Sequence, residues 1–161
     1  MDRQWSLEES LVVDAPQAIV YGLVSDLRNM GRWSPECRSV WVLRPPTRTG
    51  TRFIGFNRRG LFVWPTFGRV IQAGPNSEFV FDVGIFGLPI ARWGYRFEPE
   101  GSGTRVTEFW EDLRTNGYRG RAADLLGTVF AGTNPARRVA LNRAGMRTTL
   151  ERIARTATAA T

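Results

Sequence analysis

Short β-rich segments, separated by turn residues, fill the middle of the chain from residue 37 to residue 113. Pro45-Pro46, Gly74-Pro75-Asn76 and Gly101-Ser102-Gly103 are among the interruptions. The intervals are too short for crossover helices, so neighbouring strands must pair antiparallel through hairpins. The pattern predicts six strands: Cys37–Arg44, Thr51–Arg58, Leu61–Ala73, Ser77–Val83, Ile90–Glu98 and Thr104–Leu113.

The N-terminal part predicts one further strand and a helix. Trp5 to Val13 alternates loosely, and Asp14-Ala15-Pro16 then supplies a cap and a proline suited to a first helical turn. Apolar residues recur every three or four positions from Pro16 to Arg28, which indicates an amphipathic helix. Asn29-Met30-Gly31 is expected to break this helix, and Trp33-Ser34-Pro35 to form a short turn.

The C-terminal part becomes helical. Arg121 to Ala131 is rich in alanine and leucine, and Asn134-Pro135 marks a break. From Pro135 to about Ala157 a single stripe collects Val139, Met146, Leu150 and Ile153. A basic amphipathic helix also suits a membrane surface, but a sheet that needs a cover favours a core helix. The whole chain, 1–161, is expected to form one α+β domain.

Several segments resemble one known family in the same order along the chain. They are Val12-Val13-Asp14-Ala15-Pro16 with Val24-Ser25-Asp26, Trp33-Ser34-Pro35-Glu36, Gly50-Thr51-Arg52-Phe53, Gly103 to Glu108, and Met146 with Leu150 to Ile153. With these segments the chain is similar to the polyketide cyclase/dehydrase and lipid-transport family of the START-like (SRPBCC, helix-grip) superfamily.

The resemblance implies a curved seven-stranded antiparallel sheet wrapped around a long C-terminal helix, with short helices after the first strand. It also implies an internal cavity for a small hydrophobic ligand that is polyketide-, lipid- or quinone-like. The shared segments are structural marks, so the family's catalytic residues cannot be carried over, and fold alone does not choose among cyclases, carriers and hormone-binding proteins.

The amino-acid composition excludes several kinds of catalytic and metal-binding sites. The chain has no histidine, all 22 basic residues are arginines, and Cys37 is the single cysteine. These absences exclude Ser-His-Asp triads, histidine-ligated metals, Schiff-base lysines and cysteine clusters. No metal or other cofactor is expected, and Cys37 is interpreted as a packing residue.

The net charge of +7 would attract anionic partners. The arginines are spread along the chain, which favours a solvated basic surface over a dedicated phosphate track, and no basic motif interleaved with aromatics indicates nucleic-acid binding. An anionic membrane surface remains a candidate partner. The chain lacks a secretory signal pattern and is expected to be cytoplasmic, and no pattern predicts an oligomeric state.

Aromatic side chains on alternating strand positions are the candidates for the cavity wall. On Ile90–Glu98, Trp93 and Tyr95 share a face with Ala91 and Phe97, which should point inward. Such rings could line a site for a flat molecule or fill the interior. The predicted ligand-binding residues are Phe67, Arg69, Phe79, Phe81, Phe86, Trp93, Tyr95, Trp110, Tyr118 and Met146.

The loop Gly84–Pro89 is unusually apolar for a turn. Ile85, Phe86 and Leu88 could form a lid, contact a membrane or partner, or tuck back onto the helix. Gly84 and Gly87 would supply hinge freedom in the first case.

Strand Thr104–Leu113 carries the candidate chemistry. If Val106 points inward, Glu108, Trp110 and Asp112 do so too, and a buried carboxyl would have a raised pKa. The opposite register would instead bury Thr107, Phe109 and Leu113, leave Glu108 and Asp112 in water, and raise the question of where Glu111 lies. Glu108, Asp112 and Tyr95 are therefore candidate catalytic residues, although an ion pair, for example with Arg69, or a solvated face is favoured over catalysis.

Three function classes follow. The first is a small-molecule-binding protein, in one form a cofactor-independent cyclase, aromatase or dehydratase that shuttles protons through Glu108, Asp112, Tyr95 or Tyr118. The second is a non-catalytic lipid carrier at an anionic membrane. The third is a regulatory interaction protein.

Overall fold

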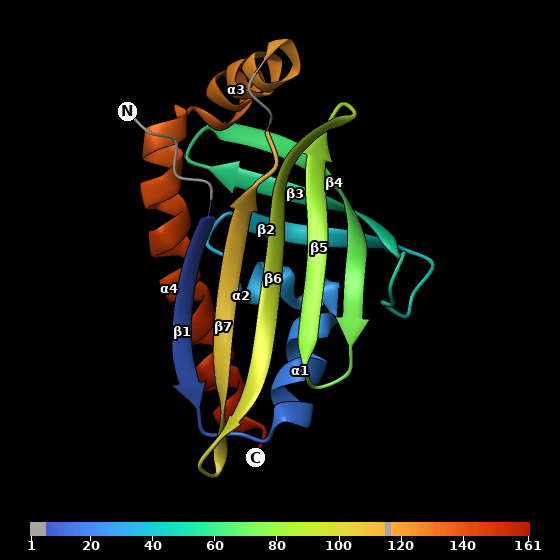
Figure 1. Cartoon of the computed structure of the whole chain (residues 1–161), viewed down its shortest axis with the longest axis vertical. Coiled ribbons are helices and arrows are strands. Elements are labelled where there is room, and N and C mark those ends of the chain that lie inside the picture. Colours follow the sequence, from blue (N-terminus) through green and yellow to red (C-terminus); the bar gives the residue numbers. More distant parts are fainter. Residues whose placement is uncertain (1–5, 115–116) are drawn as a thin grey trace.

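Seven antiparallel strands form one sheet in the computed structural model, which describes residues 6–114 and 117–161. The strand order is β1-β7-β6-β5-β4-β3-β2 (Figure 1). The strands are β1 Ser6–Val13, β2 Cys37–Leu43, β3 Arg52–Arg59, β4 Phe62–Gly74, β5 Glu78–Ile85, β6 Leu88–Glu100 and β7 Gly103–Asp112. All seven were expected from the alternating pattern, with ends displaced by one or two residues; Trp5, the predicted start of the first, lies outside the described residues.

The helices are α1 Gln17–Ser25, the 3₁₀ turn Leu27–Asn29, α2 Met30–Trp33, α3 Tyr118–Ala131 and α4 Pro135–Ala159. The prediction of a helix from Pro16 to Arg28 is wrong at its end. Asp26 is extended, with φ −81° and ψ 95°, and its carboxylate accepts a hydrogen bond from the backbone N–H of Arg28. This local bond competes with helix continuation, so the chain breaks there and becomes helical again over Met30–Trp33, where a break and a turn were expected.

Bulges and glycines let the sheet curve. The register shifts between Cys37 and Ser39, between Val70 and Gln72, and between Val83 and Gly84. Gly94 lies beneath a ring on the neighbouring strand, because an added Cβ would come within 2.1 Å of the Phe109 ring. Local curvature of this kind leaves room between the sheet and the helices.

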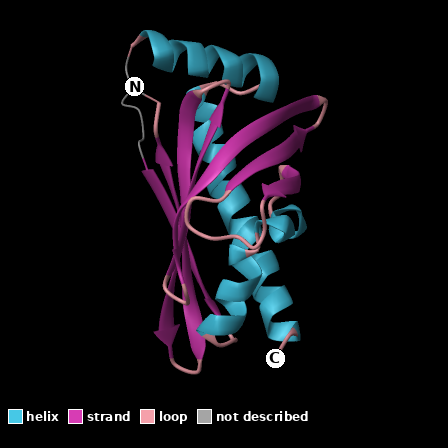
Figure 2. Ribbon diagram, turned by 90° about the vertical axis from the view of Figure 1, so that its right-hand side faces the viewer, coloured by secondary structure: helices cyan, strands magenta, loops and turns pink. Residues whose placement is uncertain are grey.

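The long helix α4 crosses one face of the sheet (Figure 2) and contacts β1, α1 and α2. Asn134 caps it by accepting a hydrogen bond from the Arg137 N–H at 2.9 Å, and Pro135 occupies its first turn. The predicted stripe is confirmed: Met146, Leu150 and Ile153 are buried and Val139 is half-buried. Leu150 and Ile153 belong to the main core, together with Val20, Val24 and Trp33 of the N-terminal helices.

Helix α3 lies across one end of the sheet (Figure 2) and contacts β4 and β6. It ends at Gly132, whose left-handed backbone has φ 62° and whose N–H bonds to the Thr128 carbonyl. The Phe62 ring lies so close to Gly132 that an added Cβ would meet it at 2.5 Å. The end of α3 is thus fitted against the β3–β4 hairpin.

Candidate functional site

A cavity of about 200 Å³ lies between the sheet and helix α4. The sheet contributes Phe53, Trp64, Phe81, Trp93, Tyr95, Glu108 and Trp110, α4 contributes Leu141, Asn142, Met146 and Thr149, and α3 contributes Ala123 and Gly127. Most of the wall is apolar or aromatic, as in small-molecule sites. A cavity of roughly 150 Å³ accommodates benzene, so this one fits a compact molecule of one or two rings.

Glu108 and Tyr95 are the polar pair buried in this wall. They face each other across strands β6 and β7, where they are direct register partners. The Tyr95 hydroxyl donates a hydrogen bond to Glu108 Oε1 at 2.9 Å, and the two residues are only 1% and 3% exposed. Glu108 Oε2 is buried and has no hydrogen-bond partner among the described residues. The protein thus orients Glu108 Oε1 through a hydrogen bond, while Oε2 is available to a ligand.

Burial sets the protonation of this pair. Removal from water raises the pKa of Glu108 from 4.5 to about 8, more than the Tyr95 hydrogen bond lowers it. Burial, reinforced by the adjacent Glu108, also raises the pKa of Tyr95 well above its usual value. At neutral pH Glu108 is therefore mainly a carboxylic acid, which can donate a hydrogen bond or a proton into the cavity.

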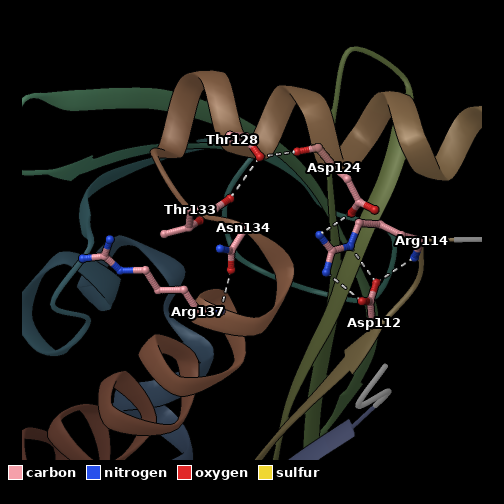
Figure 3. A network of polar contacts seen from close by, with 7 residues as sticks. All are labelled: Asp112, Arg114, Asp124, Thr128, Thr133, Asn134 and Arg137. Atoms are coloured by element: carbon pink, nitrogen blue, oxygen red, sulfur yellow. Dashed lines mark hydrogen bonds and ion pairs between the residues drawn. The ribbon is translucent and has the colours of Figure 1, made fainter. Parts of the chain in front are cut away.

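Asp112, the second predicted carboxylate, is buried on the same strand face but serves another purpose (Figure 3). Its Oδ1 accepts bonds from the Arg114 N–H and Nε at 2.9 and 2.8 Å, and its Oδ2 accepts from Nη2 at 2.7 Å. Arg114 Nη1 reaches Asp124 of α3 at 2.9 Å. Asp112 is absent from the cavity lining and is held in an ion pair, the alternative that the sequence favoured over catalysis, with Arg114 as its partner instead of Arg69.

The catalytic candidates on β7 depended on a strand register in which Val106 points inward, and β7 has this register. Val106, Glu108, Trp110 and Asp112 are all buried, as the first alternative predicted. The opposite register, with Phe109 inside, is wrong, because Phe109 is half-buried over Gly94 and beneath the Arg96 guanidinium at 5.1 Å.

A second polar group lies where Glu36 and α4 meet in the cavity lining. The Arg138 guanidinium forms two hydrogen bonds with the Glu36 carboxylate and lies 5.7 Å from the centre of the Trp64 ring. Asn142, one turn further along α4, is buried, lines the cavity, and makes no side-chain hydrogen bond with a described residue. Sequence reasoning missed these residues because their meeting depends on how α4 lies on the sheet.

Five predicted ligand-binding residues line the cavity besides Glu108: Phe81, Trp93, Tyr95, Trp110 and Met146. Five others do not. Phe79 is buried in the core, next to Phe81, and Tyr118 is 84% exposed at the start of α3. Phe67 and Arg69 point outward, because the inner positions of β4 are Gly68, beneath the Phe53 ring, and Val70.

Phe86 also lies outside the cavity, which changes the interpretation of the apolar loop. Strand β5 continues to Ile85 and β6 begins at Leu88, so the turn is only Phe86-Gly87, both with positive φ (49° and 75°). Ile85 is buried, lines the cavity and packs with Trp64 and Ile90 of the sheet, whereas Phe86 is exposed. A long hinged lid is therefore not formed here.

Cys37 also lines the cavity, where burial raises the pKa of its thiol to about 11. It remains a thiol at neutral pH, in keeping with the packing role expected of it. Among the described residues, no group of three or more histidine, cysteine, aspartate or glutamate side chains could hold a metal ion. In the same part of the chain, no helix is both long and apolar enough to cross a membrane.

Comparison with known proteins supports this architecture. The family model described as polyketide cyclase / dehydrase and lipid transport matches residues 4–158. The solution NMR structure of the polyketide-cyclase-like protein Cgl2372 from Corynebacterium glutamicum is 30% identical, with a TM-score of 0.63, over 97% of this chain and 93% of that one. No curated protein matches the chain.

Two di-domain ARO/CYC proteins share the fold. BexL, from the BE-7585A biosynthetic pathway, is 20% identical with a TM-score of 0.66, and StfQ, from the steffimycin pathway, is 13% identical with a TM-score of 0.70. In each case the similarity covers 95% of this chain and 50% of the larger protein. At these identities the likeness concerns the fold alone.

Proposed function

Because the chain belongs to the polyketide cyclase/dehydrase and lipid-transport family, we propose that it binds a compact, oxygen-bearing apolar molecule and dehydrates or cyclises it without a cofactor. The observation that carries this proposal is the unpartnered Oε2 of Glu108 in the cavity wall. A buried polar atom without a partner is costly, and a ligand oxygen would satisfy it.

Glu108 is suited to act first as an acid. In a β-hydroxy ketone, Oε2 would give its proton to the departing hydroxyl group, the C–O bond would break, and water would leave. The carboxylate so formed would accept the proton from the neighbouring α-carbon as the C=C bond forms. The carboxylic acid is thereby restored, and the products are one enone and one water.

Tyr95 is assigned the role of positioning Glu108. Its hydrogen bond holds Oε1 and leaves Oε2 directed at the ligand, while the high pKa of the phenol keeps it a donor throughout. Asn142 is suited to donate from the opposite wall to a ligand carbonyl.

Two measurements separate binding from turnover. Trp64, Trp93 and Trp110 line the cavity, so binding of aromatic β-hydroxy ketones should change intrinsic tryptophan fluorescence, and turnover should appear as enone absorbance. E108Q keeps the shape but has no proton to give, so we expect unchanged binding within about threefold and a loss of turnover of at least roughly a hundredfold. The matched control is E98Q, an exposed glutamate on β6. Absence of any ligand-dependent fluorescence change would refute the proposal.

A carrier without turnover is the second candidate function. It is favoured by exposed apolar side chains on β2, β3 and β4, outside the cavity, which a soluble enzyme would not need. Binding with equal affinity by wild type and E108Q, with no enone formed by either, would support the carrier over the enzyme.

A further inference from the structure

The outer face of strands β2, β3 and β4 carries a continuous set of large apolar side chains, which are exposed except for the half-buried Ile54. Trp41, Ile54 and Phe67 are consecutive register partners across the three strands, and Phe56 lies two residues along β3. Leu61 and Val63 continue the set at the β3–β4 hairpin. We call Trp41, Ile54, Phe56, Leu61, Val63 and Phe67 the outer apolar patch; Leu61 is 94% exposed and Trp41 69%.

The segment that forms these strands and the loops between them carries an excess of positive charge equal to the net charge of the protein. Residues 37–77 contain seven arginines and no aspartate or glutamate, which equals the net charge of +7, whereas the rest of the chain is balanced with fifteen basic and fifteen acidic residues. Arg38, Arg44, Arg48, Arg52 and Arg69 are exposed and form no ion pair with a described residue. On strands β5 to β7 and β1, by contrast, Arg92 pairs with Asp82, Arg96 with Glu8 and Arg105 with Glu100.

We propose that the outer apolar patch and its surrounding arginines bind the surface of an anionic phospholipid bilayer. Arginines are attracted to anionic headgroups, and aromatic and aliphatic side chains between them gain by burial at the boundary of the acyl chains. This goes beyond the proposed function, because the cavity lining includes none of the patch residues.

The patch adjoins the cavity through the β3–β4 hairpin. Val63 belongs to the patch, and the next residue, Trp64, points to the other side of the strand and lines the cavity. Phe62, on the same hairpin, packs against Gly132 at the end of α3. A bilayer at this hairpin would lie beside the α3 end of the cavity, where an apolar ligand could pass between membrane and protein.

The patch fits a bilayer better than other occupants. A second copy of the chain would bring these five arginines, which form no ion pair with a described residue, against five others, and this repulsion opposes a symmetric contact. Nucleic-acid bases stack on aromatic rings, but Ile54, Leu61 and Val63 are aliphatic and gain little from stacking. Burial at the acyl-chain boundary of a bilayer is favourable for aromatic and for aliphatic side chains.

Vesicle co-sedimentation tests the proposal with the full chain. We expect binding to phosphatidylcholine vesicles containing about 30% phosphatidylglycerol, little binding to phosphatidylcholine alone, and a decline as NaCl rises from about 0.05 to 0.5 M. R38Q/R52Q should weaken binding about 25-fold, since each arginine near such a surface contributes roughly fivefold. L61Q/V63Q should weaken it roughly tenfold through lost apolar burial.

The control R105Q/R155Q removes the same charge outside residues 37–77 and should bind within about threefold of wild type. Unchanged tryptophan fluorescence titrations with cavity ligands in all variants would keep this test separate from the proposed function. Failure of wild type to bind at low salt, or equal loss in patch and control variants, would overturn the proposal. So would patch-dependent dimers in light scattering, or patch-dependent capture of single-stranded RNA, in the absence of vesicle binding.

Discussion

Glu108 occupies a place where a charged carboxylate is disfavoured and a neutral carboxylic acid is well accommodated. Aromatic side chains surround it in the cavity wall, Tyr95 donates to one oxygen, and the other oxygen has no hydrogen-bond partner among the described residues. Asp112, four residues away on the same strand face, has the opposite surroundings, with the Arg114 guanidinium on both oxygens. Two buried carboxyls of one strand thus have opposite electrostatic surroundings.

The raised pKa of Glu108 predicts how stability changes with pH. Its pKa is 4.5 when unfolded and about 8 when folded. Ionisation of this group therefore costs nothing below about pH 4.5 and destabilises the fold increasingly up to about pH 8. Above that pH the penalty is constant, on the order of 5 kcal/mol. E108Q removes this penalty, so its free energy of unfolding relative to wild type should rise with pH across that window.

Urea denaturation of both proteins at pH 5, 7 and about 8.5 measures the effect. The control E98Q changes an exposed glutamate and should follow the wild-type curve. A difference between E108Q and wild type that stays constant with pH would mean that Glu108 titrates normally in the folded state.

The sequence could place Glu108 and Asp112 on the inner face, because period-two alternation from Val106 requires it. It could not distinguish their roles. Arg114 lies just beyond the strand, and its second partner, Asp124, belongs to a helix whose position over the sheet end follows from packing. Phe67 and Arg69 were assigned to the wrong face because the pattern of β4 hides the requirement for Gly68 beneath the Phe53 ring.

Helix α3 is the element most dependent on a few polar contacts. It has no side-chain cap at its first residue, and it is bounded by Gly117 and Gly132, both with positive φ. The Arg114–Asp124 pair connects its middle to β7, and the Thr128 hydroxyl donates to the Asp124 and Thr133 carbonyls (Figure 3). Ala123 and Gly127 of the same helix line the cavity. The connection to Arg114 therefore also stabilises one end of the cavity.

D124N should loosen α3 without unfolding the core. The substitution removes one charged partner of a partly buried ion pair. We expect the rate of amide hydrogen exchange to rise roughly tenfold in about the first ten residues of α3, and to stay unchanged in α4. L125Q, which changes an exposed neighbour on the same helix, is the matched control and should exchange as wild type does. Equal exchange in D124N and wild type would show that packing alone holds α3.

Element boundaries show which local signals are decisive. The strands were predictable to within two residues because alternation and turn residues agree throughout the sheet. The break at Asp26 was not, because Leu27 keeps the apolar spacing of the helix and is fully buried, while the competing Asp26 bond leaves no mark in that pattern. The loop around Phe86 was predicted too long for a related reason, since a two-residue turn with apolar neighbours looks like an apolar loop.

At the scale of the whole molecule, folding turns an uneven distribution of acidic residues into a charged face. The arginines occur along the entire chain, so their spacing alone indicated only a basic surface. The absence of acidic residues from 37–77 matters once β2, β3 and β4 lie side by side and carry those arginines on one half of the sheet. Repulsion among these neighbouring arginines opposes folding. Salt, which screens their charges, is therefore expected to raise the free energy of unfolding.

This expectation can be tested without any partner. Arg52 and Arg69 are direct cross-strand neighbours, and like charges in that position are destabilising. R52Q should therefore raise the free energy of unfolding by about 0.5 kcal/mol at low ionic strength. The gain should vanish near 0.5 M NaCl, roughly where the Debye length falls below the distance between neighbouring side chains. R155Q removes one charge outside residues 37–77 and should bring no such gain. A gain in stability for R52Q that does not depend on salt would point to improved packing instead. A salt-dependent gain would mean that the arginines of residues 37–77 are retained at the expense of stability. That is expected for a surface that binds an anionic partner.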